Sequence, residues 1–410
     1  MTQMTPRLPR LTHTSVYFFF LLALAQSFAA GCGGSDDQVP SKSTSKGGKR
    51  GTTDTAGSSS SAVDGNGGAA GTNTSESGGM TSSASAGSAG MQISATAGAW
   101  AGPTADCGLP AVGTTGVPQP ADTPADFTIL NWAGYKGAVT YTFDDGNSSQ
   151  ITNYPALQAL GVHFTFYLIT GKSSASNPIW AQAIKDGHEL GNHTKNHYQT
   201  GTAADVDAAT SFLQDKYGVR AWTMAAPYGD ASYIALAQSR FSINRGVSNA
   251  IIAPNGSSNP FNLPCFIPDT GALAADFRAQ IDSAQAAGGW RVVLVHGFSG
   301  GTDGAYQPVD ITEFTSSVEH TKSLGNMWID SMVNVGSYWL GQKAVSAATL
   351  STTDGDKTWA WTLPPNFPPG KCLRVTVPGG TVKQAGNVIP WDDHGYYEIF
   401  LDAGSLTLSP

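Results

Sequence analysis

The chain has 410 residues, of which 13% are charged, and its formal net charge is −8. This acidic balance, and the lack of a Lys/Arg cluster in the part expected to fold, argue against a nucleic-acid partner. The length suits one large domain with additions, or two domains.

Residues 1–31 have the pattern of an export signal: two arginines precede an apolar run, and small residues stand directly before Cys32. This arrangement resembles a bacterial lipobox and predicts that Cys32 is lipidated. Because Ala29 stands where Leu is usual, ordinary signal cleavage with an incidental Cys32 is the alternative. We therefore expect an exported bacterial protein, anchored to the membrane of the cell envelope through Cys32 or otherwise secreted.

Residues 32–106 are rich in Gly, Ser and Thr and contain almost no large apolar side chains. Such a segment cannot bury enough surface to offset its chain entropy, so we expect a disordered linker. The remaining cysteines are Cys107, Cys265 and Cys372. An exported chain permits disulfides, but three thiols cannot all pair and the sequence does not decide the pairing.

Strand-like and helix-like segments alternate after residue 127. The predicted strands cover residues 137–143, 162–169, 220–225, 241–247, 291–296 and 326–329. The predicted helices cover residues 150–160, 179–185, 205–217, 232–239, 273–287 and 311–324, with a last helix ending at 340. This alternation predicts a parallel α/β fold, open or closed into a barrel, over residues 107–343.

Residues 344–410 have a different character. Short β-type runs at 358–363, 373–377, 381–383 and 396–400 are separated by Pro and Gly, which predicts a small all-β module. Trp359, Trp361 and Trp391 are expected to form the hydrophobic core of this module in preference to a sugar-stacking face. His394 lies in an Asp-rich stretch that favours a turn over a metal site.

Reactive side chains stand at the ends of separate predicted strands. Asp144 and Asp145 follow residues 137–143, His193 and His197 come later, and His296 ends another strand. The carboxyl ends of parallel strands converge on one face, and two imidazoles with one carboxylate suit a divalent metal with open positions. Adjacent strand residues point to opposite sides, so the turn after Asp145 must break this alternation if both carboxylates are to face one ion.

Four motifs resemble those of polysaccharide deacetylases with a NodB-homology domain, carbohydrate esterase family 4. They are Thr-Phe-Asp-Asp-Gly at 142–146, His-Thr-Lys-Asn-His at 193–197, Ala-Ala-Pro-Tyr-Gly at 225–229 and Leu-Val-His at 294–296. The resemblance covers roughly residues 136–340. It implies a deformed (β/α) barrel and a hydrolase that removes acetyl groups from an extracellular or cell-wall polysaccharide, of the N-acetylglucosamine or acetylated-xylan type.

The resemblance also implies roles for individual residues. Asp145, His193 and His197 would hold Zn²⁺ or another divalent ion such as Co²⁺. Asp144 would be the general base that activates water, and His296 the general acid that protonates the leaving group. A divalent ion and a histidine acid suit the cleavage of an amide, which needs an activated nucleophile and help for a poor leaving group.

The backbone N–H of Tyr228 would help to stabilise the oxyanion, and Leu294 would line the acetyl pocket. The family's third motif usually begins with an Arg that orients the base, but this chain has Ala225 there. Arg245, on the next predicted strand, is a candidate replacement, with a simple structural role as the alternative. The Asp that the family places beside its acidic His has candidates at Asp269, Asp276 and Asp330.

The other histidines receive structural interpretations: His163 as a core residue inside a strand, and His188 as a packing residue near the metal loop. We expect a monomer. Two other functions stay open. One is a carbohydrate-binding surface protein with a degenerate, weakly active site, suggested by Ala225. The other is a non-haem Fe(II) oxygenase, which the alternating βα pattern disfavours.

Overall fold

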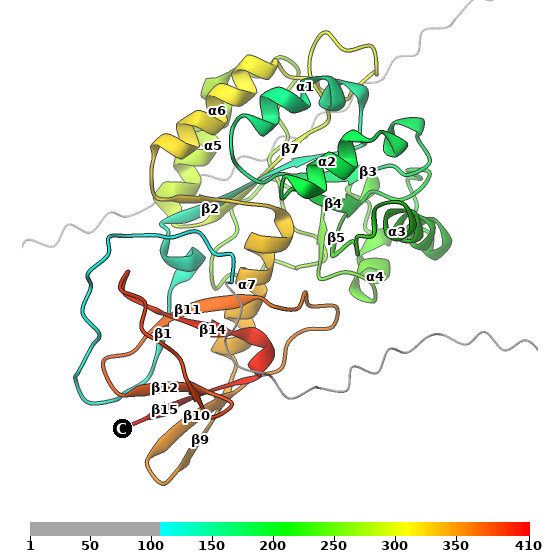
Figure 1. Cartoon of the computed structure of the whole chain (residues 1–410). Helices are drawn as coiled ribbons and strands as arrows, with labels where there is room; N and C mark the ends of the chain where they lie inside the picture. Colours follow the sequence, from blue (N-terminus) through cyan, green and yellow to red (C-terminus); the bar gives the residue numbers. More distant parts are fainter. Residues whose placement is uncertain (1–106) are drawn as a thin grey trace, which may run out of the picture. The chain divides into compact units, whose positions relative to one another are not determined.

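The computed structural model describes residues 107–410. The predicted signal at 1–31, Cys32 and the predicted linker at 32–106 lie outside the described residues. Within residues 107–410, no helix is both long and apolar enough to cross a membrane. Figure 1 shows an α/β part and a β-rich part with the helix α7 (Met332–Ser346) between them.

A sheet of parallel strands forms the centre of the α/β part (Figure 1). Its order is β6-β5-β4-β3-β2-β7, and β8 pairs with the free half of β2. The strands are β2 (Gly137–Phe143), β3 (Thr165–Leu168), β4 (Glu189–Asn192), β5 (Thr223–Ala225), β6 (Ile243–Arg245), β7 (Trp290–Val295) and β8 (Met327–Ile329). All seven residues of β2 are buried, as expected for a strand covered on both faces.

An extended segment at residues 263–266 closes the gap between the outer strands β6 and β7. Leu263 N–H donates to the Asn244 carbonyl at 3.0 Å, and Phe266 N–H donates to the Val292 carbonyl at 2.8 Å. The curled sheet therefore closes into a deformed (β/α) barrel, the fold predicted from the sequence.

The helices that surround the sheet are α1 (Ser148–Gln158), α2 (Ile179–Lys185), α3 (Ala203–Tyr217), α4 (Ser232–Gln238), α5 (Ala274–Ala287) and α6 (Ile311–Ser323). Short 3-10 helices lie at Asn131–Gly134, Ser173–Ser176, Pro227–Gly229 and Leu401–Ala403. Local signals set several ends: Thr202 caps α3 by accepting from Asp205 N–H, and Gly218 ends α3 with φ +68°.

The β-rich part consists of two antiparallel sheets, with orders β1-β11-β14 and β13-β12-β15-β10-β9. Its strands are β9 (Thr349–Thr353), β10 (Asp356–Ala360), β11 (Cys372–Thr376), β12 (Thr381–Gln384), β13 (Asn387–Val388), β14 (Tyr397–Phe400) and β15 (Ser405–Ser409). The remaining strand, β1 (Thr128–Ile129), precedes the barrel in sequence yet pairs with β11. The module therefore includes chain from both sides of the barrel.

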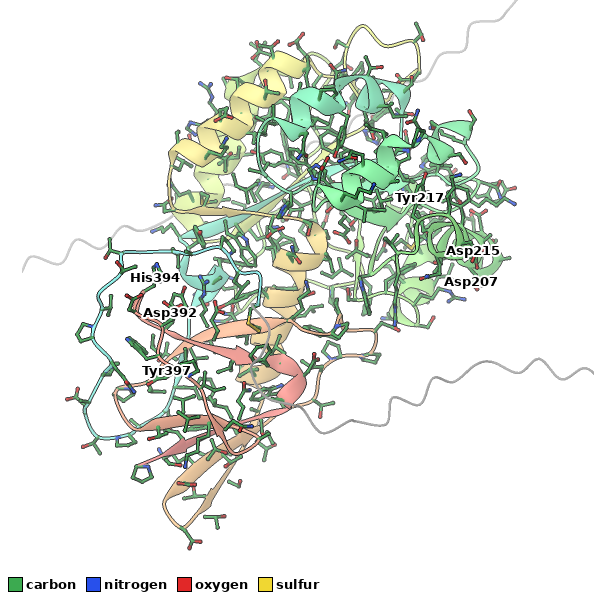
Figure 2. The ribbon with its side chains drawn as sticks, in the orientation of Figure 1. Asp207, Asp215, Tyr217, Asp392, His394 and Tyr397 are labelled. Carbon is green, nitrogen blue, oxygen red and sulfur yellow. A yellow bond between two sulfur atoms is a disulfide. The ribbon has the colours of Figure 1, made fainter. Side chains whose placement is uncertain are left out.

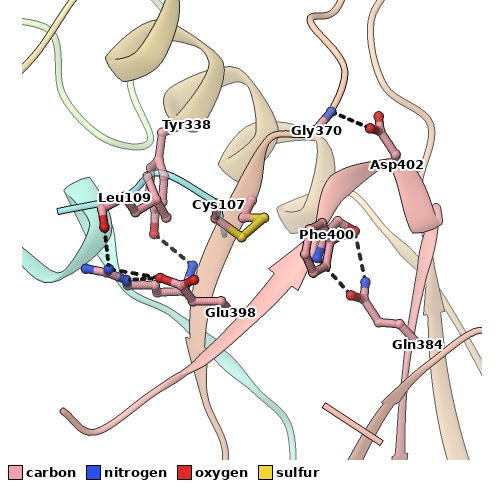
Figure 3. The surroundings of a disulfide bond; sticks show 10 residues. Cys107, Leu109, Tyr338, Gly370, Gln384, Glu398, Phe400 and Asp402 are labelled. Carbon is pink, nitrogen blue, oxygen red and sulfur yellow. Dashed lines mark hydrogen bonds and ion pairs between the residues drawn. A yellow bond between two sulfur atoms is a disulfide. The ribbon is translucent and has the colours of Figure 1, made fainter. Parts of the chain in front are cut away.

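A disulfide between Cys107 and Cys372 fixes the start of the described chain to β11 (Figure 3). Beside it, the buried guanidinium of Arg374 pairs with Glu398 at 2.9 Å and donates to the carbonyl of Leu109 at 3.3 Å. Cys265 is a buried free thiol. The pairing that the sequence left open is therefore Cys107 with Cys372.

One of the two hydrophobic clusters in the described residues extends across the barrel and the module. Tyr338 and Trp339 of α7 pack in the same cluster as Trp290 of the barrel and Leu373 of the module. Trp359 also belongs to this cluster, and its side chain is buried, as the sequence predicted. Because the two parts bury apolar surface against each other, we expect them to unfold together.

Most predicted elements are confirmed, with ends that differ by a few residues. The strand at 137–143 and the helix at 179–185 have the predicted bounds. The prediction for His163 is wrong: it precedes β3 (Thr165–Leu168), and its side chain is 47% exposed. Its Nδ1 lies 3.2 Å from Asp330 Oδ1, so the ring sits at the edge of the fold as the partner of a carboxylate.

His188 is buried, and its ring is held in one tautomer. Nδ1 accepts from the Phe164 N–H at 3.0 Å, so the proton lies on Nε2, 2.8 Å from Gln158 Oε1. Burial, together with the neighbouring His163, lowers the pKa of His188 to about 4. Protonation would also place a second donor opposite the Phe164 N–H, which further disfavours the charged ring.

We expect this histidine to make the protein less stable in acid. The unfolded chain binds a proton near pH 6.5 that the folded chain does not bind until about pH 4, so the free energy of unfolding should fall between these values, by up to about 3 kcal/mol. Denaturant titrations at several pH values measure how the free energy of unfolding changes with pH. His188→Gln retains an acceptor for the Phe164 N–H but does not titrate. If the free energy of unfolding of this variant depends on pH as strongly as that of the wild type, His188 is not the cause of the pH dependence.

Candidate active site and metal centre

The turn after β2 brings two adjacent carboxylates to one side. Asp145 has φ +76° and Gly146 has φ +64°, so the alternation of the strand breaks directly after Asp144. Glycine is favoured at 146, because its φ is left-handed and a Cβ there would lie 2.9 Å from the Leu168 side chain, which would have to shift. The Nε2 atom of His193 consequently lies 3.5 Å from an oxygen of each carboxylate.

His193 and His197 present ring nitrogens to the same point. His193 Nδ1 lies 2.9 Å from the Ala225 carbonyl, which can only accept, so Nδ1 carries the proton and Nε2 has a free lone pair. His197 Nε2 lies 3.9 Å from Asp145 Oδ1. Its φ of +57° is a left-handed conformation, as are those of Thr194 and Asp145, and such strain is concentrated at functional sites.

The geometry of these three side chains fits a divalent cation. One ligand atom each from Asp145, His193 and His197 lies within 4.8 Å of the other two. Ligands about 2.0–2.2 Å from a tetrahedral zinc ion stand roughly 3.3 Å apart. The separations of 3.5 and 3.9 Å between the carboxylate oxygen and the two ring nitrogens are close to this spacing.

The electrostatics agree with ligand roles. Burial and the neighbouring His193 lower the pKa of His197 to about 4, so its ring is neutral at pH 7 and able to bind a cation. Burial alone would raise the pKa of Asp145, but the hydrogen bond and charge of His193, with the charge of Lys172, lower it well below its usual value. Asp145 is therefore ionised at neutral pH.

Asp144 pairs with a buried arginine from the next strand. Arg245 Nη2 donates to Asp144 Oδ2, and both side chains are almost fully buried. Arg245 on β6 lies in register with Ala225 on β5, the position where the family motif has its Arg. Although burial opposes its charge, Asp144 raises the pKa of Arg245. The structure thus places a guanidinium where the motif lacks one, as the sequence analysis suggested.

His296 ends β7 and faces the same cavity as the carboxylates. Burial lowers the pKa of its ring, and its Nδ1 has no hydrogen-bond partner among the described residues. The three aspartates considered as its partner are engaged elsewhere: Asp269 accepts from Gln307, Asp276 from Leu273 N–H, and Asp330 contacts His163.

The predicted residues line a single cavity of about 510 Å³. Its lining consists of Asp144, Asp145, His193, His197, Ala226, Tyr228, Arg245, Val247, Ile267, Leu294, His296 and Tyr306. Tyr228 is 62% exposed, has φ +56°, and its ring centroid lies 4.6 Å from that of His197. The site residues predicted within residues 107–410 therefore lie together, whereas Cys32 is outside the described residues.

Two polar residues near Asp145 escaped the sequence analysis. Lys172 Nζ lies 3.9 Å from Asp145 Oδ2 and donates to Asn147 Oδ1 at 3.0 Å. Asn147 in turn donates to Asp145 Oδ2 at 3.2 Å and to the His296 carbonyl at 2.8 Å. This network ties the carboxylate to the end of β7. Neither residue stands in a recognisable motif, so no sequence signal could have found it.

A second cluster of side chains of the kinds that bind metal ions lies in the C-terminal module. Asp392, Asp393 and His394 each offer one ligand atom, and Figure 2 labels Asp392 and His394 in the β-rich part of the molecule. His394 donates through its backbone N–H to Asp392 Oδ1, and its Nδ1 lies 2.7 Å from the same oxygen. The pairing of Asp392 with Tyr396 closes a tight turn, which confirms the predicted turn.

Residues 133–241 match the sequence model of the polysaccharide deacetylase family. A putative polysaccharide deacetylase of Bacillus subtilis, YheN, is 31% identical over 110 residues, which are 25% of this chain and 39% of the relative. The peptidoglycan-N-acetylglucosamine deacetylase of Bacillus cereus is 29% identical over 86 residues, 20% of this chain and 40% of that protein. A gellan lyase of a Bacillus species is 32% identical over 113 residues, 25% of this chain and 4% of the lyase.

The chain therefore spans less than half of the length of these curated relatives. Among solved structures, a putative polysaccharide deacetylase from Mycobacterium smegmatis is aligned at 16% identity and a TM-score of 0.38, over 59% of this chain and 100% of that one. The Xyl-CE4 domain of a multidomain xylanase from the hindgut metagenome of Trinervitermes trinervoides is aligned at 18% identity and a TM-score of 0.35, over 48% and 88%.

Fold and site together define a (β/α)-barrel protein with two carboxylates and three histidines in one cavity. Over residues 133–241, the chain is similar in sequence to the polysaccharide deacetylase family.

Proposed function

We propose that this protein is a metal-dependent hydrolase that removes acetyl groups from an extracellular or cell-wall polysaccharide, of the N-acetylglucosamine or acetylated-xylan type. One observation carries the proposal. Asp145, His193 and His197, which could bind a metal ion, line the same cavity as the buried carboxylate of Asp144, which pairs with Arg245. The peptidoglycan-N-acetylglucosamine deacetylase among the relatives supports the substrate class.

Asp145, His193 and His197 would hold the ion, Zn²⁺ or another divalent ion such as Co²⁺. Such an ion, when bound, supplies Lewis acidity, which polarises an acyl carbonyl and makes water more acidic. The protein's share is to hold these three ligands close together, with Asp145 fixed by Asn147 and His193 fixed by the Ala225 carbonyl.

Asp144 would act as the general base. Its Oδ2 is bound by Arg245, while its Oδ1 is buried without a hydrogen-bond partner among the described residues. A buried oxygen of this kind is available to take a proton from a nucleophilic water. Arg245 would act as a positioning residue that holds the carboxylate in one orientation in the cavity.

His296 would act as the general acid, because its ring lines the cavity and its Nδ1 has no partner among the described residues. A proton on this ring can pass to the departing amine or alcohol. The backbone N–H of Tyr228 would stabilise the oxyanion, and Leu294 would contact the acetyl methyl group. Lipidation at Cys32, export, and a monomeric state remain predictions for the whole chain.

Acetate release from chitin, peptidoglycan and acetylxylan fragments tests this function. We expect release that falls more than about a hundredfold after chelation, because both activation of water and carbonyl polarisation depend on the ion, and that returns when Zn²⁺ or Co²⁺ is added. Asp145→Asn should behave like the chelated protein. Asp392→Asn, in the other acidic cluster, is the matched control and should behave like the wild type. No acetate from any fragment, or release insensitive to chelator, would contradict the proposal.

A carbohydrate-binding protein with a degenerate site is the second candidate, motivated by Ala225. The pairing of Arg245 with Asp144 weighs against it, because the base has a guanidinium partner in spite of that substitution. Binding of the same fragments without acetate release would favour this candidate. The iron oxygenase is disfavoured, since the ligands here stand on a parallel α/β barrel.

A further inference from the structure

The loop between β7 and α6 forms a rim of the cavity that no motif covers. At its tip, Tyr306 lines the cavity although its side chain is 61% exposed. Its ring centroid lies 5.2 Å from that of His296, and the two planes meet at 86°. A large aromatic ring left open to solvent beside the reacting groups lacks the burial that would explain it as a packing residue.

Hydrogen bonds from two sides hold this loop in place. The Asp303 carboxylate accepts from the Ser149 N–H at 2.6 Å, at the start of α1, and from the Ala305 N–H at 3.3 Å. On the other side, the Gly271 N–H donates to the Pro308 carbonyl at 3.1 Å. Tyr306 therefore stands on a loop that is already held in place, so little loop entropy is lost when a ligand binds to it.

A second exposed tyrosine stands elsewhere on the rim. Tyr228 packs against His197 and follows β5, whereas Tyr306 packs against His296 and follows β7. In the sheet, β4, β3 and β2 lie between β5 and β7. The two rings therefore mark different sides of the cavity, and the reactive carboxylates on the turn after β2 come from between them.

We propose that Tyr306 is a substrate-binding residue that packs against a sugar ring of a glycan chain crossing the cavity rim on the His296 side. A pyranose offers an apolar C–H face that suits the face of an aromatic ring, while the phenol hydroxyl stays in water. The inference rests on the proposed function and adds that the protein binds a sugar unit of the polysaccharide beyond the acetylated one.

Kinetics of the metal-loaded full chain test this role. For Tyr306→Ala we expect KM for acetylated chito-oligosaccharides or xylo-oligosaccharides to rise about tenfold, as the loss of one aromatic contact implies, with a smaller change in kcat. The loss in kcat/KM should be larger for oligomers than for a small aryl acetate, which has no sugar to contact the ring. Tyr306→Phe should retain oligomer binding, because the ring remains.

Leu273→Ala is the matched control, since Leu273 is 57% exposed but does not line the cavity, and it should behave like the wild type. Equal KM values for Tyr306→Ala and wild type on oligomers would overturn the inference, and so would an equal loss on oligomers and aryl acetate. If the wild type releases no acetate, the proposed function fails. Calorimetric binding of the same oligomers to both proteins then decides the role of Tyr306 separately, equal affinities overturning it and a weaker variant supporting it.

Discussion

Arg245→Ala is expected to lower the free energy of unfolding by about 3–5 kcal/mol, because it leaves the buried Asp144 carboxylate without its charge partner. Acetate release should fall by roughly a hundredfold to a thousandfold, since the carboxylate proposed as the general base would lose the partner that orients it. Denaturant unfolding and kcat/KM on an acetylated oligosaccharide measure the two effects.

The register of β5 and β6 suggests a control variant for Arg245→Ala. Ala225 lies beside Arg245 on the neighbouring strand, so the double variant Ala225→Arg with Arg245→Ala moves the guanidinium to the position of the family motif. We expect the double variant to recover part of the activity lost in Arg245→Ala. Arg245→Lys should recover less, because an ammonium cannot reproduce the planar fork of donors. Wild-type activity in Arg245→Ala would remove the positioning role.

Loss of the disulfide should also lower the free energy of unfolding strongly. Cys107 and Cys372 are 265 residues apart, and a cross-link that closes so long a loop strongly restricts the unfolded chain. Replacing both with Ser, or reducing the bond, should lower the free energy of unfolding by about 4–5 kcal/mol. Activity at low temperature should persist, because the lining of the cavity includes neither cysteine.

Unfolding of the oxidised protein, the reduced protein and the double Ser variant measures this effect. The Ser variant should show no response to reductant, which separates the disulfide from any effect of reductant on the buried Cys265 thiol. Equal unfolding midpoints with and without reductant would contradict the prediction. A changed slope with denaturant would show that the unfolded chain had become less compact, as a lost cross-link implies.

Local patterns were sufficient for the central elements of the fold. The strand at 137–143 is an unbroken run of buried residues, and the helix at 203–217 carries its own cap at Thr202 and stop at Gly218. Strands paired with distant chain were harder: β1 has two residues and gains its partner, β11, from more than two hundred residues away. The sequence of a two-residue strand contains no pattern that predicts such a pairing.

The candidate site likewise contains residues that local sequence patterns indicated and residues that they did not. Residues in motifs were found, and Arg245 was suggested because the next strand had to lie beside Ala225. The left-handed turn at Asp145 could only be inferred as a requirement, since φ depends on the closed barrel around it. Tyr306, Lys172 and Asn147 stand in loops whose course is set by tertiary contacts, which a single sequence does not encode as a pattern.

The covalent bond between Cys107 and β11 also decides how a mechanical load would travel through the molecule. Tension applied to the chain ahead of Cys107 would pass directly through the sulfur atoms into the C-terminal β module, bypassing residues 108–129 and the barrel strands. The barrel strands, which carry the candidate active site, would then bear little of a load applied between the N-terminal side and the C-terminal β module.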